Sequence, residues 1–116
     1  MMKLFVSPNK LIIQAVSTYF PTSHLKYSGG SSNYAIFRIS NRDSIYTGSG
    51  KNIGVRSYGY IDIFTEYDPS SSSSVMKDVE SSLVSHGINV LGISTTYSPD
   101  DNYFHTEFEI EVVQDV

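Results

Sequence analysis

The chain has 116 residues, a usual size for one domain with one modest hydrophobic core. Forty per cent of its residues are hydrophobic, with nine Tyr and six Phe, which excludes the polar, highly charged profile of disordered chains. Without cysteine it can form no disulfide, thiol nucleophile or thiolate metal site. A net charge of −4 argues against direct binding of nucleic acid phosphates. We therefore expect a single folded domain over residues 1–116.

The charge is unevenly distributed along the chain. Residues 1–56 hold seven basic groups and one acid, Asp43, whereas residues 57–116 hold Lys77 against eleven acids. One interpretation is two oppositely charged faces that favour head-to-tail contact between identical subunits. The other is that strands from both halves share one sheet and neutralise each other locally. The sequence leaves both interpretations open.

The first predicted element is a helix that begins at Ser7 and Pro8, an N-cap followed by the first helical position. Apolar residues then recur at helical spacing, and the helix should end near Phe20 because Pro21 disfavours helical geometry before it. The Ser- and Gly-rich stretch 22–32 indicates a loop.

Two strands and a hairpin follow in the middle of the chain. The segment 33–40 predicts a strand, and the glycines at 48 and 50 favour a turn that joins it to the long strand signal at 53–67. A short extra strand is expected at 45–47. Residues 41–57 should form a projecting hairpin arm.

A second helix and two further strands complete the prediction. Five serines at 70–74 precede an apolar stripe that begins at Val75, and we expect a mobile loop whose serine caps a helix ending at Gly87. Strands are predicted at 88–97 and 103–113, joined by the turn sequence SPDDN. The expected fold is α+β, with two helices packed on one side of a mainly antiparallel four- to five-stranded sheet in the order α-β-β-α-β-β.

Alternation along the strands sorts polar side chains onto one face. In the strand 53–67 it separates Ile61 and Ile63, which should be buried, from residues suited to protein contact. In the last strand it lines up three carboxylates, for which a solvated face is the competing explanation. The candidate subunit interface comprises Tyr60, Asp62, Phe64, Glu66, Glu107, Glu109 and Glu111 with the cations Arg38, Arg42, Lys51 and Arg56.

The motifs of known chemistry are incomplete or absent. GSGK at 48–51 resembles a phosphate-binding loop, but Ile45 and Asn52 stand where that motif needs glycine and Ser or Thr. The three histidines are scattered, and the best local metal group, Asp100, Asp101 and His105, is spread over a turn and a strand. We therefore predict no catalytic residues, no metal and no cofactor, and a non-enzymatic protein.

The apolar segments are too short for membrane insertion. The opening MMKLFV stops at Ser7 and Pro8, short of the apolar core of a signal peptide, and no segment approaches the roughly 20 residues needed to cross a bilayer. A soluble protein without a membrane partner is expected.

Residues 53–113 resemble bacteriophage tail terminator and tail completion proteins, a group of minor tail proteins. The resemblance rests on the strand YGYIDIFTEYD at 58–68, the helix VMKDVESSLVSHG at 75–87 and the segment INVLGISTTYSPDDNYFHTEFEIEVV at 88–113. It implies a structural virion protein, made in the host cytoplasm, that forms a ring, commonly a hexamer. The ring caps the tail tube and joins it to the neck or connector, and no catalytic residues come with it.

A second hypothesis is a small regulatory or ligand-binding domain of the ferredoxin-like type, which also places two helices over an antiparallel sheet. It predicts a pocket and a melting temperature that rises with ligand. An enzyme with a dispersed site is the least favoured reading, because no nucleophile, base or metal group is evident.

Overall fold

The computed structural model describes residues 6–69 and 75–115, which form an α+β fold of two helices and a five-stranded mixed sheet. The strands lie in the order β1-β2-β3-β5-β4. β1 is parallel to β2, and the other three neighbouring pairs are antiparallel. The α+β class and the mainly antiparallel sheet are confirmed. The opening segment and the serine cap predicted at 70–74 lie outside the described residues.

Helix α1 (Pro8–Val16) begins as the sequence predicts. The Ser7 hydroxyl accepts a hydrogen bond from the Lys10 N–H at 3.2 Å, and Pro8 occupies the first turn. The helix ends earlier than predicted, at Val16, and a turn carries the chain to Phe20. Helix α2 (Val75–Ser85) is followed by Gly87 at φ +79°, a left-handed conformation that suits glycine.

The predicted loop at 22–32 is wrong in part, because it contains strand β1 (Thr22–His24). β1 pairs with Ala35, Ile36 and Phe37 of β2. The three polar residues of β1 show no alternation that would predict a strand, so pairing with β2 decides their conformation. The element order is therefore α-β-β-β-α-β-β, and the predicted α-β-β-α-β-β is short by one strand.

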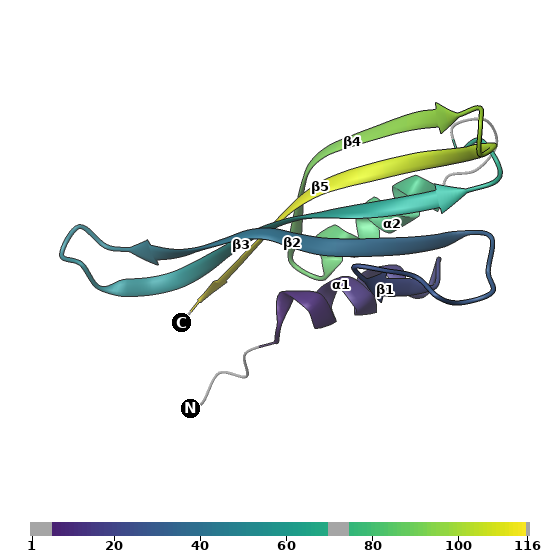
Figure 1. Cartoon of the computed structure of the whole chain (residues 1–116). Helices are drawn as coiled ribbons and strands as arrows, with labels where there is room; N and C mark the ends of the chain where they lie inside the picture. The colour runs from purple at the N-terminus through teal and green to yellow at the C-terminus, as the bar shows by residue number, and fades with distance from the viewer. Residues whose placement is uncertain (1–5, 70–74, 116) are drawn as a thin grey trace.

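Strands β2 (Tyr34–Tyr46) and β3 (Asn52–Thr65) form one continuous hairpin, in which β2 is longer than predicted and β3 begins one residue earlier and ends two residues earlier than predicted. The separate short strand expected at 45–47 is part of β2, which is irregular between Ile39 and Asn41. Figure 1 shows the distal halves of β2 and β3 extending well beyond both helices. This distal hairpin, residues 41–57, is called the arm below.

Strands β4 (Ile88–Ser98) and β5 (Tyr103–Asp115) close the sheet, with β5 between β3 and β4. Residues of both helices join the buried residues of β2, β3, β4 and β5 in one core cluster. The sheet contributes Phe37, Ile61 and Phe108 among others, all fully buried. The predicted burial of Ile61 and Ile63 is confirmed. No residue of the arm belongs to this cluster.

Candidate functional site

The face of the sheet opposite the core carries most of the predicted interface residues. Strand register sets Phe64 beside His105, Asp62 beside Glu107, and Tyr60 beside Glu109. This face, called the polar face below, carries Tyr34, Arg38, Tyr58, Tyr60, Asp62, Phe64, His105, Glu107, Glu109 and Glu111. The structure thus brings residues of β2, β3 and β5 together in rows across three adjacent strands.

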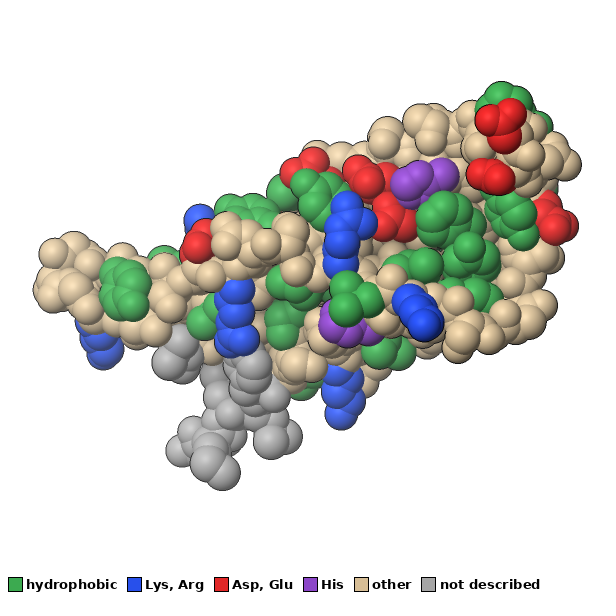
Figure 2. Space-filling view, viewed as in Figure 1, with side chains coloured by type: hydrophobic (Ala, Val, Ile, Leu, Met, Phe, Trp, Pro, Cys, Tyr) green, Lys and Arg blue, Asp and Glu red, His purple; other side chains and the backbone are tan. Residues whose placement is uncertain are grey.

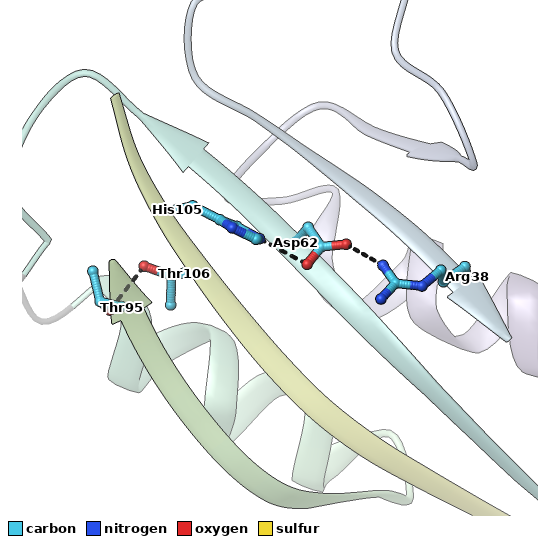
Figure 3. A network of polar contacts seen from close by, with 5 residues as sticks. All are labelled: Arg38, Asp62, Thr95, His105 and Thr106. Atoms are coloured by element: carbon cyan, nitrogen blue, oxygen red, sulfur yellow. Dashed lines mark hydrogen bonds and ion pairs between the residues drawn. The ribbon is translucent and has the colours of Figure 1, made fainter. Parts of the chain in front are cut away.

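Asp62 is at the centre of the polar face and is buried, with a relative exposure of 7%. Its Oδ2 lies 2.6 Å from Arg38 Nη1 of β2, and its Oδ1 lies 2.7 Å from His105 Nε2 of β5 (Figure 3). Each oxygen of this carboxylate therefore has a partner, and hydrogen bonds that involve a charged group are stronger than neutral ones. The network ties the three central strands together on their polar side.

Arg38 makes a second contact within the chain, because its guanidinium lies 4.6 Å from the centre of the Tyr60 ring. The cation is thus held between a carboxylate and an aromatic face. Arg56 of the arm forms an ion pair with Glu111, with Nε 3.4 Å from Oε2 but not in hydrogen-bond geometry, and Asn89 Nδ2 donates to Oε1 of the same glutamate at 3.1 Å. For these two arginines, the interpretation of local charge neutralisation between the two halves of the chain fits the contacts.

Four rings form a continuous stack beside this network. Tyr27 stacks on Tyr34 at 4.4 Å between centroids, Tyr34 on Phe64 at 5.2 Å, and Phe64 on His105 at 4.7 Å. The stack crosses β2, β3 and β5 and fixes the ring of His105, which also bonds Asp62. Phe64, predicted as an interface residue, is therefore half-buried by its neighbours.

The remaining predicted residues lie apart from this centre. Arg42 pairs in register with Ser57 and lines a different pocket with Pro8 and His24, so it does not share the polar face. Lys51 follows the turn at the tip of the arm and is exposed. Glu66 comes just after β3 and is also exposed, with its backbone N–H donating to Asn33 Oδ1 at 2.9 Å.

A metal ion is a possible occupant of the central group by residue type. Asp62, His105 and Glu107 each offer a ligand atom, and these atoms lie within 4.8 Å of one another. A tetrahedral zinc site needs ligand atoms about 3.3 Å apart, as follows from bonds of about 2.0–2.2 Å. Because Asp62 already accepts bonds from Arg38 and His105, an ion would have to displace His105 from it. The contacts are explained by the ion-pair network alone.

Asp100, Asp101 and His105, the best local metal group in the sequence, are not brought together as one group in the structure. Asp101 Oδ2 accepts a hydrogen bond from Ser98 Oγ at 3.2 Å within the β4–β5 turn, whereas His105 bonds Asp62. The turn groups its acids locally, and strand pairing carries His105 to a different partner.

A pocket of about 480 Å³ opens between the aromatic stack and the β4–β5 turn. Its lining includes Tyr34, Phe64, Tyr97, Asp101, Tyr103 and His105. Partial burial, and then the charge of Glu66 and the neighbouring Tyr34, raise the pKa of Tyr103 above its ordinary value of 10.0. Tyr103 is therefore a neutral hydrogen-bonding group at physiological pH, and the pocket offers aromatic rings with one carboxylate.

Sequence reasoning placed Asp62 and the glutamates on one face but missed the partners of Asp62. The missing information is that β5 lies between β3 and β4, which brings His105 to Phe64 and Asp62. The alternation of β5, with apolar residues on one side and charges on the other, indicates one buried and one polar face, but it does not show which strands lie on its two edges. Tyr27 and Tyr34 gave no signal that marked them as members of a stack.

No family model matches the chain, and no curated protein matches it. Within residues 6–69 and 75–115, no helix is long and apolar enough to cross a membrane.

Proposed function

We propose that this chain is a non-enzymatic structural subunit of the tail terminator or tail completion type, which assembles into a ring and joins a phage tail tube to the neck. In this proposal both helices cover one face of the sheet, and the polar face and the arm contact other protein subunits. The virion tail is then its place of action, and the tail tube protein and a connector protein are its partners.

The observation that carries the proposal is the arm. The arm projects past both helices at its tip, while Arg42 and Ser57 at its base line a pocket with Pro8 of α1, and none of its residues joins the core cluster (Figure 1). Strand β5 pairs with the base of the arm at residues 54–57, and the rest of the arm is a two-stranded hairpin, which is marginally stable by itself. The arm does not help to bury the core of its own chain. Its presence is explained if it contacts another subunit.

Charge supports a contact between subunits. Figure 2 shows basic side chains along the arm, over β2 and on the side of α1 and β1, and acidic ones mainly toward β4 and β5. Arg38 and Arg56 are paired within the chain, so they do not carry this contact. Lys51, by contrast, forms no ion pair within the part of the chain that the structure describes, and the same is true of Glu109.

Light scattering across protein concentration, at low and moderate salt, tests self-association. We expect a ring-sized particle that loses mass as salt rises, because contacts between exposed charges weaken with ionic strength. Lys51→Glu should lower the mass at a given concentration. Lys77→Glu makes the same charge change on α2, where the residue is also exposed, and should leave the mass unchanged. A particle that is monomeric at every concentration contradicts the proposal.

The 480 Å³ pocket favours a second candidate function, a small ligand-binding domain. The element order α-β-β-β-α-β-β differs from the β-α-β-β-α-β order of ferredoxin-like folds, so this candidate rests on the pocket alone. It predicts a monomer whose melting temperature rises with a small aromatic or cationic compound, and whose response is lost in Tyr103→Ala.

A further inference from the structure

β4 is an edge strand with less protection than usual against pairing with other chains. Eleven residues, Ile88–Ser98, pair with β5 on one side, and no strand in the described part of the chain pairs with the other side. The strand contains no charged residue and no proline, the two residue types that natural edges use most to block pairing. Leu91, Ile93 and Tyr97 are 50%, 43% and 47% exposed. Its one irregularity lies between Val90 and Gly92.

The opposite side of the sheet also ends in a free edge, and that edge is in the arm. β1 covers β2 only from Ala35 to Phe37. From Asn41 to Tyr46, β2 pairs with β3 on one side, and no other strand among the described residues pairs with it. Six residues of extended chain span about 20 Å, enough for a stable run of main-chain hydrogen bonds.

Charge decides which strand fits the β4 edge. The β4–β5 region, residues 88–115, contains six acids and no Lys or Arg. Pairing β4 with β4 of a second copy would bring two such regions together, and like charges across an interface repel. The arm contains three basic residues against one acid, Asp43, and with Arg56 paired to Glu111 in the same chain, Arg42 and Lys51 keep the arm basic. Pairing β4 with the arm therefore joins regions of opposite charge.

We propose that β4 of one copy pairs with the free edge of β2 in the arm of the next copy, so that the sheet continues from subunit to subunit. The contact uses two different surfaces on each chain, and contacts of this kind form closed rings when the rotation between subunits closes. It gives main-chain partners to the outward backbone groups of both edges, and the Arg42 N–H, which donates to Asn41 Oδ1 at 2.9 Å, would exchange that partner for one on β4. The inference rests on the proposed self-association and names the strands that would carry it.

The absence of cysteine allows a direct test by disulfide cross-linking of the full chain. Strand register puts Asn41, Ser94 and Thr96 on the polar side of the sheet, and all three are exposed. The experiment mixes Asn41→Cys with Ser94→Cys, and separately with Thr96→Cys, under mild oxidation. We expect a disulfide-linked dimer in at least one mixture and little cross-linking in any of the three variants alone.

A pair of lysine variants supplies a second readout. Ile93→Lys puts a charge on the β4 edge and should raise the dissociation constant about tenfold or more, because edge lysines oppose strand addition. Val84→Lys makes the same kind of change at a residue of α2 that is 60% exposed, and it should leave association unchanged.

The outcomes separate this inference from the proposed function. Cross-linking of Ser94→Cys or Thr96→Cys alone shows β4 paired with β4 and overturns the inference. Oligomers that form without any mixed disulfide and are indifferent to Ile93→Lys also overturn it, while self-association stands. A strict monomer overturns both.

Discussion

Asp62 shows how much the environment of a single carboxylate can differ from its appearance in the sequence. Alternation correctly assigned it to the polar face, among residues expected to contact a partner. The structure buries it and gives both of its oxygens partners from neighbouring strands, Arg38 and His105. These partners come from 24 residues before it and 43 after it, a separation that no local pattern reveals. Asp62, which the sequence marked only as an interface residue, therefore helps to hold the sheet together.

Replacing Asp62 should destabilise the folded chain. Asp62→Asn removes the negative charge that holds both partners, and we expect the free energy of unfolding to fall by about 1–3 kcal/mol, the range for a buried polar group left poorly satisfied. Urea denaturation measures this loss. Glu109→Gln is the matched control, since it makes the same chemical change at an exposed residue of the same face and should alter stability by less than about 0.5 kcal/mol. Equal effects of the two substitutions would contradict the assigned role of the network.

At the scale of elements, the sequence predicted what depends on local pattern and missed what depends on pairing. Ser7 with Pro8, Gly87 and the turn SPDDN marked element ends through their own backbone preferences, and both helices and four of the five strands were found. β1 was missed because its three residues have no strand pattern of their own and are extended through pairing with β2. The position of β5 between β3 and β4 was equally hidden, because strand order is decided by the assembled core.

Gly59 is the point where the arm leaves the body of the sheet, and it allows a close approach of two strands. It pairs with Ile39 just before the irregularity in β2, and a Cβ at this position would collide with the Arg38 carbonyl oxygen and lie 3.1 Å from Ile39 Cδ1. Because the oxygen belongs to the backbone, the strands would have to separate.

We therefore predict that Gly59→Ala lowers the free energy of unfolding by about 1–3 kcal/mol, measured by urea denaturation. Gly48→Ala provides the comparison, because nothing lies within 4 Å of a Cβ at that position near the tip of the arm. A loss no larger than that of Gly48→Ala would show that β2 can move away without cost.

At the scale of the whole molecule, the charge asymmetry of the sequence is only partly cancelled by folding. The sheet interleaves the two halves, and Arg38 and Arg56 find acids of the second half within the same chain. The tip of the arm and the β4–β5 end remain far apart in an elongated molecule with extents of 53 × 25 × 25 Å. Two copies of the chain could bring together opposite charges that lie too far apart to meet within one copy. Local neutralisation therefore accounts for Arg38 and Arg56, whereas the proposed contact between subunits concerns Lys51 and the acids of the β4–β5 end.

The separation of arm and core predicts that folding and assembly can be uncoupled. Replacing residues 43–56 by an Asn-Gly turn, a sequence that suits a two-residue hairpin, joins Arg42 to Ser57, which are already paired across the two strands. Since no arm residue belongs to the core cluster, we expect the shortened chain to unfold cooperatively within a few degrees of the melting temperature of the intact monomer, as followed by circular dichroism. Light scattering should show that it no longer self-associates at concentrations where the intact chain does. If the shortened chain fails to fold, the arm is part of the stable body, and if it still forms the same oligomer, the subunits meet elsewhere.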